Sequence, residues 1–303
     1  MMRWWYLIKL LLHLPKLNKA LGSPFRTLWN ILIGKDEHYL HIRNGYFLLR
    51  KITPPNLYGY VLLRAAGLQL AETQPDAPDQ LVWQLSTNGE FLTRLAMGMD
   101  LMTLYELFVR KDYGDDFVGK VVIDVGAYNG DSSVFFALQG AKKVIALEPY
   151  PPNYALARTN TARMRLEEKV SLLPVALGPQ DGRLTLQVAA TSPDANSFDP
   201  SGSPLLKLVH YTDTAEVEVF SLPTLMERYG LEAVDFLKLD CEGCEFAVIE
   251  NLTPEQMRRV RAWHIEYHAK PDKLIERLRS AGFQVRRERD RGGILGYLIA
   301  ELP

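Results

Sequence analysis

Short apolar runs alternate with helix-like patterns along the chain from Lys120 to the C-terminus. This order predicts right-handed crossovers and an α/β fold with a mainly parallel sheet covered on both faces. The predicted strands are 121–125, 144–147, 170–175, 234–240, 261–267, 284–287 and 294–300, and the predicted helices are 132–139, 153–164, 222–229, 244–251 and 271–281. A polar turn separates the last two strands, so we expect a closing antiparallel hairpin there.

Two further segments, GRLTLQVA at 182–189 and AEVEVFSL at 215–222, alternate with a period of two, as strands do. Between them lies the polar, proline-containing stretch TSPDANSFDPSGSP. We expect this stretch to be a loop that lies over a site.

The first 35 residues are basic and apolar, with six Lys or Arg and no Asp or Glu. Lys9, His13 and Lys16 form a narrow polar stripe on a predicted helix that is otherwise apolar around most of its circumference. Pro15 should kink or end this helix, which is shorter than the ~20 residues of a bilayer span and lacks a signal-peptide cleavage site. A second short helix is predicted at 24–33.

Two interpretations of residues 1–35 remain open. One is an interfacial anchor whose aromatic and basic residues meet an anionic membrane surface. The other is a helix packed on the rest of the chain or on a second subunit of a dimer. Because exposed patches of this kind are uncommon in soluble monomers, the pattern favours the packed helix.

Residues 36–116 form a predicted N-terminal α+β extension between this segment and a C-terminal domain at 117–303. From Tyr39 the pattern alternates, with a hairpin-like turn at Asn44 and Gly45. Residues 54–80 are mixed in character, and the stretch 73–79 is predicted to be a loop. A helix is predicted within 101–114, leading into the C-terminal domain.

Composition narrows the class of protein. Lys and Arg number 35 against 36 Asp and Glu, so a net charge of -1 provides no general attraction for nucleic acid. A hydrophobic content of 47% is ample for a core. The only cysteines, Cys241 and Cys244, cannot build a disulfide framework or a four-thiolate metal site. We therefore expect a cytoplasmic protein, peripheral at the inner membrane face if residues 1–35 are an anchor.

The stretch VVIDVGAYNGD at 121–131 has the pattern of a strand, a glycine turn and the start of a helix. Such a turn brings backbone N–H groups and a helix N-terminus close to a ligand. Asp124 occupies the place of the first glycine in a dinucleotide-binding G-x-G-x-x-G turn, and its carboxylate would repel a pyrophosphate. The spacing therefore favours S-adenosylmethionine, which carries an ammonium and a sulfonium.

Glu148 ends the next predicted strand, 22 residues after Gly126. An acid at that place can accept hydrogen bonds from both ribose hydroxyls of a nucleotide. The plainer alternatives are an ordinary buried strand with a glycine turn, and a solvated carboxylate in a loop.

A second stretch, DFLKLDCEGCEF at 235–246, places Asp240, Glu242 and Glu245 around a glycine turn. Clustered carboxylates are costly unless a cation, a proton or hydrogen-bond donors compensate them. In the segment AWHIEYH, Glu266 and His268 lie on one strand face. We expect four candidate catalytic side chains to converge at neighbouring strand ends, as a general base or a hard-metal site, although a strand histidine is more often structural. These four are Asp240, Glu242, Glu266 and His268.

These motifs resemble the FkbM-type methyltransferases, a branch of the class I S-adenosylmethionine-dependent methyltransferases. The resemblance is carried by DVGAYNGD, by ALEP, by VALG at 175–178, by DFLKLDCEGCE, which is similar to D-x-x-K-x-D-x-E-G-x-E, and by IEYH, which is similar to E-x-H. The two cysteines fill variable positions of this pattern, so their C-x-x-C spacing is interpreted as coincidence. The resemblance implies a seven-stranded, Rossmann-like class I fold and methylation of a hydroxyl on a sugar, glycan or other natural-product acceptor.

The resemblance also implies which residues bind the cofactor. Asp124, Gly126, Ala127 and Gly130 would hold its methionine part, together with Asp131 and Ser132. Glu148, followed by Pro149, would bind the ribose, and Ala176 with Leu177 would lie near the adenine.

Methyl transfer is an in-line displacement at a sulfonium carbon, so an enzyme must align the acceptor oxygen and raise its nucleophilicity. His268 or Glu266 could take the hydroxyl proton, or a divalent cation held by Asp240, Glu242 and Glu266 could polarise the oxygen. Because carboxylate spacing alone does not establish a metal site, we favour the metal-free base. Two other classes stay open: a nicotinamide-dependent oxidoreductase, which would need the missing first glycine, and a membrane-associated, non-catalytic binding protein that retains the fold.

Overall fold

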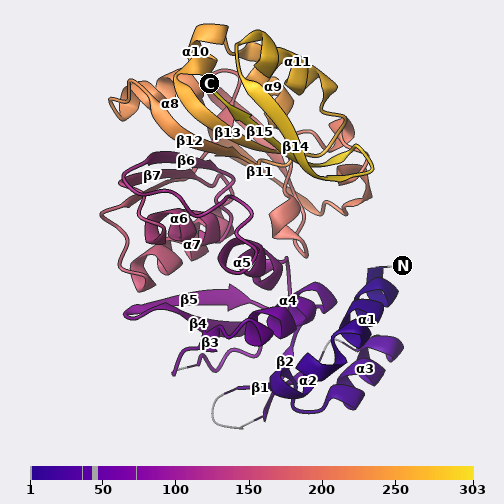
Figure 1. Ribbon diagram of the computed structural model, residues 1–303. Helices are drawn as coiled ribbons and strands as arrows, with labels where there is room; N and C mark the ends of the chain where they lie inside the picture. The colour runs from indigo at the N-terminus through magenta and orange to yellow at the C-terminus, as the bar shows by residue number, and fades with distance from the viewer. Residues whose placement is uncertain (1, 36, 43–46, 73) are drawn as a thin grey trace. The chain divides into compact units, whose positions relative to one another are not determined.

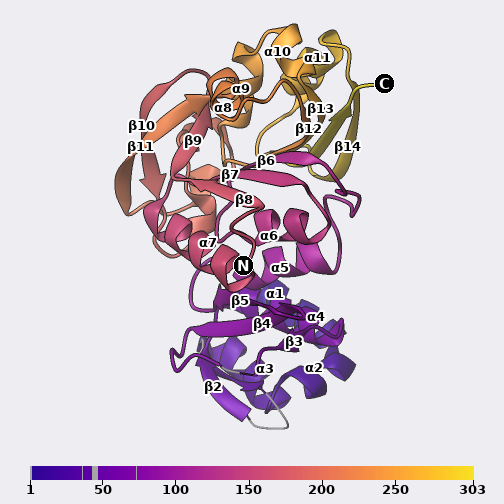
Figure 2. The same cartoon turned by 90° about the vertical axis from the view of Figure 1, so that its left-hand side faces the viewer.

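The computed structural model describes residues 2–35, 37–42, 47–72 and 74–303. The chain forms two compact units, residues 1–114 with 162–165 and residues 115–161 with 166–303. Figure 1 labels the elements of both units, and Figure 2 shows the same elements after a quarter turn.

The second unit is built on a seven-stranded sheet with the order β14-β15-β13-β12-β6-β7-β8. Strands β13, β12, β6, β7 and β8 run parallel, whereas β15 is antiparallel to both of its neighbours. The predicted α/β fold, with a mostly parallel seven-stranded sheet and an antiparallel C-terminal strand, is therefore confirmed. The strands are β6 (Val121–Val125), β7 (Lys143–Leu147), β8 (Val170–Leu173), β12 (Val234–Leu239), β13 (Val260–Tyr267), β14 (Gln284–Arg291) and β15 (Leu295–Glu301).

Helices cover both faces of this sheet, so its central strands are buried on two sides and carry few polar residues. Helices α6 (Asp131–Leu138) and α7 (Pro151–Arg163) lie on one face, and α8 (Leu222–Arg228), α9 (Glu245–Asn251), α10 (Pro254–Arg258) and α11 (Asp272–Ser280) lie on the other (Figures 1 and 2). The sequence pattern missed α10, which has only five residues and is started by a capping box between Thr253 and Gln256.

A smaller three-stranded sheet has the order β10-β11-β9, with β9 (Val175–Gly178), β10 (Gly182–Val188) and β11 (Asp213–Ser221). The antiparallel pair β10 and β11 corresponds to the two predicted alternating segments. The prediction of one strand at 170–175 was wrong, because β8 ends at Leu173 and β9 pairs with β11 instead. Pro174 lies between them and has no backbone N–H with which to continue the ladder.

The first unit begins with three helices, α1 (Met2–Leu12), α2 (Leu14–Ala20) and α3 (Pro24–Ile33). Pro15 lies in the first turn of α2, so the predicted break is present. Strands β1 (Glu37–His41) and β2 (Phe47–Lys51) pair antiparallel, and the predicted turn at Asn44 and Gly45 lies outside the described residues. Within the described residues, no helix is both long and apolar enough to cross a bilayer.

Residues 54–94 contain elements that the sequence pattern did not predict: α4 (Pro54–Ala65), β3 (Gln69–Leu70), β4 (Gln80–Ser86) and β5 (Gly89–Arg94). Helix α4 is buried from Asn56 to Leu63, so it shows no amphipathic stripe. The Asn56 side-chain amide donates to the carbonyls of Leu95, Met97 and Gly98 and so joins α4 to the chain that enters α5 (Asp100–Phe108).

Candidate active site

The glycine turn after β6 is in close contact with the backbone that follows β12. Gly126 has a φ of +77°, and a Cβ at this residue would lie 1.8 Å from the backbone oxygen of Asp240, which follows β12. Gly130, at the N-terminus of α6, has a φ of +86° and lies close to the backbone of Ala157. Only glycine allows both the left-handed backbone and these close approaches. The glycine turn and the end of β12 therefore form one continuous surface.

Asp124 is completely buried at the centre of this surface. Its Oδ2 accepts hydrogen bonds from the hydroxyls of Ser132, at 2.7 Å, and Ser133. Its Oδ1 lies 3.4 Å from Nζ of Lys238. The neighbouring Asp131 is also buried, and its Oδ1 accepts the Ser132 N–H. The carboxylate predicted to meet the ammonium of the cofactor is thus already bonded to α6 and β12, and its contact with a cofactor stays a prediction.

Glu148 lies at the end of β7, beside the same turn. Its Oε2 accepts the N–H of Tyr128 at 2.8 Å, and its Oε1 accepts the N–H of Tyr150 at 2.9 Å. Burial raises the pKa of this carboxyl to about 7, although these hydrogen bonds act in the opposite direction. Two backbone donors hold the side chain in place and leave further lone pairs on each carboxylate oxygen.

The remaining cofactor candidates lie near Glu148 or in the glycine turn. Ala127 donates its N–H to the carbonyl of Leu147. Pro149 follows Glu148 directly. Ala176 and Leu177 are buried in β9 of the smaller sheet, and Tyr150 packs against the hydrophobic cluster that contains Ala176.

Lys238 is a functional candidate that the sequence reasoning did not single out. Its Nζ donates to the carbonyls of Val125 and Gly126, at 3.1 and 2.8 Å, and lies 3.3 Å from Asp240 Oδ2. Burial opposes its charge, but Asp240 and Asp124 outweigh this effect and raise its pKa above the ordinary value. One lysine within the otherwise apolar run FLKL, at 236–239, was the signal that could have identified it.

The acidic turn after β12 is held by its own last glutamate. Glu245 is completely buried, and its two carboxylate oxygens accept the N–H groups of Cys241 and Gly243, at 3.1 and 3.0 Å. A disulfide joins Cys241 to Cys244 across the same turn. The interpretation of the C-x-x-C spacing as coincidence was therefore wrong, because the turn places the two Cα atoms 5.5 Å apart, within the range for a disulfide.

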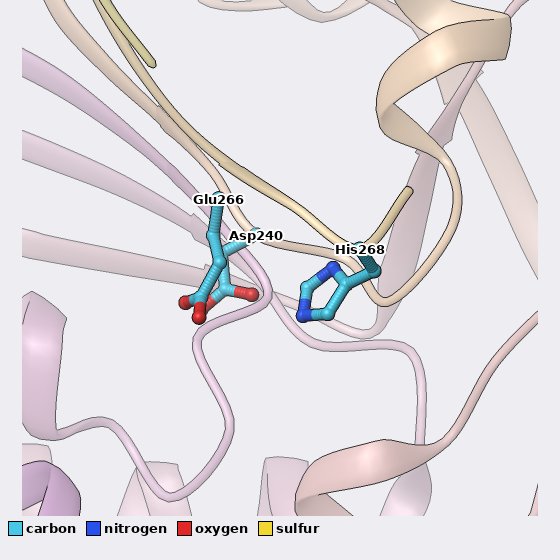
Figure 3. Close-up of side chains that lie close together, drawn as sticks. All are labelled: Asp240, Glu266 and His268. Carbon is cyan, nitrogen blue, oxygen red and sulfur yellow. The ribbon is translucent and has the colours of Figure 1, made fainter. Parts of the chain in front are cut away.

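Three side chains from two neighbouring strand ends meet at this turn. Asp240, Glu266 and His268 each offer one oxygen or nitrogen atom, and these atoms lie within 4.8 Å of one another. Figure 3 shows the two carboxylates side by side, with the imidazole of His268 next to them. Asp240 and Glu266 are half-buried, whereas His268 is buried.

Glu242 completes the group of four predicted catalytic residues. Its Oε2 lies 3.2 Å from His268 Nε2, and Glu245 Oε1 lies 3.7 Å from His268 Nδ1. Burial opposes charge on His268, but the carboxylates around it hold its pKa well above the ordinary value. Burial raises the pKa of Glu242 to about 8, although His268 acts in the opposite direction. The structure brings the four side chains together, and their catalytic roles stay a prediction.

The other histidine of β13 has a different environment. His264 is buried between the rings of Phe236 and Tyr297. Burial, together with the charge of Lys238, lowers its pKa to about 3. A neutral histidine in contact with aromatic rings is part of the packing of the sheet.

The predicted loop between β10 and β11 contacts the acidic turn. The hydroxyl of Ser197 donates to the carbonyl of Glu242, and the hydroxyl of Ser203 donates to the carbonyl of His268. Tyr211, near the end of this loop, has a buried hydroxyl, and burial together with the charge of Glu242 raises its pKa to about 12. Tyr211 was not predicted from the sequence, because nothing in its local pattern marks it.

A cavity of about 370 Å³ opens beside this loop. His268, Glu245 and Ser203 form the side nearest the acidic cluster, and Lys270 and Lys273 lie further along its wall. The cavity is thus in contact with the predicted base, and its lining combines apolar surface with charged side chains such as Glu245, Lys270 and Lys273.

Comparison with known proteins gives matches to methyltransferases. The model of the methyltransferase FkbM domain matches residues 124–285. The 2-O-methyltransferase NoeI from Sinorhizobium fredii is 28% identical over 156 residues, which are 48% of this chain and 63% of NoeI. The 31-O-demethyl-FK506 methyltransferase FkbM from Streptomyces tacrolimicus is 28% identical over 231 residues, which are 67% of this chain and 89% of that protein.

A crystal structure of methyltransferase FkbM from Methylobacillus flagellatus aligns with 65% of this chain and 47% of its own, at 12% identity and a TM-score of 0.43. This chain therefore matches less than two thirds of NoeI and about half of that solved structure. The family match covers more than half of the chain and includes the glycine turn, Glu148 and the acidic cluster. This chain belongs to the FkbM family of S-adenosylmethionine-dependent methyltransferases, as its motifs predicted.

Proposed function

We propose that this protein transfers a methyl group from S-adenosylmethionine to a hydroxyl of a sugar, glycan or other natural-product acceptor. Two curated relatives support O-methylation by their names, the 2-O-methyltransferase NoeI and the 31-O-demethyl-FK506 methyltransferase FkbM. The observation that carries the proposal is the contact of Gly126 with Asp240, because it joins the predicted cofactor turn directly to the cluster of candidate bases.

The cofactor fits the residues around the glycine turn. S-adenosylmethionine would place its ribose hydroxyls on Glu148, whose carboxylate is fixed by two backbone donors and keeps lone pairs free for further bonds. Its methionine part would lie against the turn that begins at Gly126 and ends at the N-terminus of α6. The sulfonium methyl would then point toward the end of β12, where the acceptor is expected.

In this proposal the neutral form of His268 takes the proton of the acceptor hydroxyl as the methyl group is transferred, and the population of this form rises with pH because the nearby carboxylates raise the pKa of His268. A hydroxyl is almost entirely unionised at neutral pH, so a base within hydrogen-bond reach raises its nucleophilicity. Glu242, 3.2 Å from Nε2, would orient the imidazole, Nδ1 would accept the proton, and Glu245, 3.7 Å from Nδ1, would stabilise the imidazolium that forms. Asp240 and Glu266, half-buried beside the ring, would orient the acceptor oxygen.

A divalent cation at the same cluster is the second candidate for activating the hydroxyl. The ligand atoms of Asp240, Glu266 and His268 lie close enough together to bind one ion. Two carboxylates and an imidazole are ligands that Mn²⁺ or Zn²⁺ accepts. A cation would polarise the acceptor oxygen without a protein base.

The decisive experiment is transfer of labelled methyl from S-adenosylmethionine to a panel of glycans and hydroxylated natural products, with and without a chelator. We expect turnover that persists with chelator, and its loss in Asp240→Asn and His268→Gln with cofactor binding retained. Loss of turnover on chelation, restored by Mn²⁺, would assign the hydroxyl activation to a cation. Full activity in both variants would contradict the assignment of the cluster.

Assays of cofactor binding and turnover also separate the methyltransferase from the two alternative classes, a non-catalytic binding protein and a nicotinamide-dependent oxidoreductase. A non-catalytic binding protein would bind S-adenosylmethionine without turnover on any acceptor. A nicotinamide-dependent oxidoreductase would change the absorbance of NADH, which we do not expect because Asp124 replaces the first glycine of a dinucleotide turn.

A further inference from the structure

The N-terminal helices bury one side and leave several large apolar side chains exposed on the other. On α3, Phe25 is 83% exposed and Trp29 is 60% exposed, and Leu32 and Ile33 continue the same face. Phe25 lies four residues before Trp29, and Leu32 and Ile33 lie three and four residues after it, so all four share one side of the helix. The opposite side, with the buried Thr27 and Ile31, packs inward. Helix α3 is therefore at least as apolar on its exposed side as on its packed side.

Helix α1 packs against α3 and adds to this surface (Figure 1). Its exposed apolar side chains are Ile8, Leu11 and Leu12, the last of which is 76% exposed. Tyr6 and Leu10 on the other side of α1 are buried. Among the side chains that the structure describes on these two helices, seven exposed apolar ones are called here the apolar face: Ile8, Leu11, Leu12, Phe25, Trp29, Leu32 and Ile33. Exposed apolar side chains gathered on adjacent helices are typical of a protein or membrane interaction site.

The charged residues of the N-terminal segment 1–35 are all positive, and the first acid that the structure describes after α3 is the exposed Glu37. Residues 1–35 contain six Lys or Arg and no Asp or Glu. Lys16, Lys19, Arg26 and Lys35 are exposed on α2, on α3 and just after α3. An anionic partner is therefore favoured over a neutral or cationic one.

We propose that the apolar face of α1 and α3 binds an anionic lipid membrane in its plane. Tryptophan, phenylalanine and leucine on one side of short helices, with flanking lysines and arginines, are suited to the boundary between head groups and acyl chains. A second copy of this chain fits less well. A two-fold interface would bring the positive charge of one N-terminal segment against the same charge of the other. The proposal does not depend on the methyl-transfer chemistry.

Vesicle co-sedimentation of the full-length protein tests the proposal. We expect binding to phosphatidylcholine vesicles that contain about 30% phosphatidylglycerol, weaker binding to pure phosphatidylcholine, and loss of the difference at high salt. The variant Phe25→Ser/Trp29→Ser removes two exposed side chains and should lower the partition coefficient about tenfold or more. The variant Lys16→Gln/Lys19→Gln should lower it roughly thirtyfold on anionic vesicles only.

Val118→Ser is the matched control, because Val118 is 77% exposed but belongs to the second unit. It should bind vesicles as the unchanged protein does. Thermal unfolding midpoints that match those of the unchanged protein would show that the N-terminal variants are folded. Equal vesicle binding by Phe25→Ser/Trp29→Ser would overturn the proposal. A dimer in sedimentation velocity that this variant dissociates, with no vesicle binding, would assign the face to a second copy and also overturn it.

Discussion

Replacing Gly126 with alanine tests whether the glycine turn and the acidic turn form one rigid unit. The new Cβ would lie 1.8 Å from the Asp240 carbonyl oxygen, against 3.4 Å or more for an ordinary contact. Gly119 offers a matched control, because its φ of +74° is close to the +77° of Gly126 and a Cβ there would meet no atom within 4 Å. The two variants share the backbone strain and differ in the clash.

The structure allows the loss of folding stability to be estimated for Gly119→Ala and for Gly126→Ala. Alanine in a left-handed conformation costs about 1–2 kcal/mol, which is the whole expected loss for Gly119→Ala. In Gly126→Ala the Asp240 carbonyl must also move by about 1.6 Å, and overpacking of this kind costs about 1–3 kcal/mol more. That movement strains the hydrogen bonds from Asp240 N–H to Val125 and from Lys238 to Gly126. We expect a total loss of about 2–5 kcal/mol in Gly126→Ala.

Urea unfolding followed by circular dichroism measures the loss of stability, and calorimetric titration measures the affinity for S-adenosylmethionine. Gly126→Ala should lose both stability and cofactor affinity, whereas Gly119→Ala should lose only the smaller amount of stability. Equal losses in the two variants would refute the reasoning, because they would mean that the contact between Gly126 and Asp240 has no energetic weight.

Three other predictions concern the buried charges. Lys238→Met leaves Asp124 and Asp240 without their shared cation and should lower the free energy of unfolding by about 3–5 kcal/mol. An unchanged urea unfolding midpoint would show that other groups compensate these two carboxylates. Since the pKa of Glu148 is raised to about 7, the carboxylate form that accepts the ribose hydroxyls is lost as the pH falls through 7. Affinity for S-adenosylmethionine should thus be about tenfold lower at pH 6 than at pH 8, and Glu148→Gln should bind weakly at both. A base must be unprotonated, and the carboxylates around His268 hold the pKa of its imidazole well above the ordinary value. The rate of methyl transfer should therefore rise as the pH is raised above neutrality, and a falling rate would contradict the assignment of His268 as the base.

Much of the fold could be predicted because the second unit repeats one local pattern. Strand β6, the glycine turn and α6 are short, strongly apolar and punctuated by Gly126 and Gly130, so local preference and tertiary packing agree. The change of sheets at Pro174 could not be predicted, because β9 pairs with β11, a strand that comes more than 35 residues later in the chain. Helix α4 was missed because tertiary packing buries its whole circumference and removes the periodic signal.

In the candidate site, too, some features follow from the local sequence pattern and others depend on long-range contacts. Carboxyl ends of parallel strands meet at one sheet edge, so the convergence of Asp240 with Glu266 and His268 followed from the strand pattern alone. The roles of Lys238 and Glu245 did not follow, because they depend on which backbone groups come within hydrogen-bond distance. The disulfide was misread for a related reason: a C-x-x-C spacing permits a bond only where the backbone turns sharply, and the turn is known only from the structure.

The contact between Gly126 and Asp240 also has a meaning for protein engineering. A library that aims at new acceptors should leave Gly126, Lys238 and Asp240 unchanged, because each holds the others in place. Diversity belongs on the cavity wall, at Lys270 and Lys273, which line the cavity. Substitutions in the first group are expected to cost stability or activity, whereas substitutions on the cavity wall would test whether this cavity decides the acceptor.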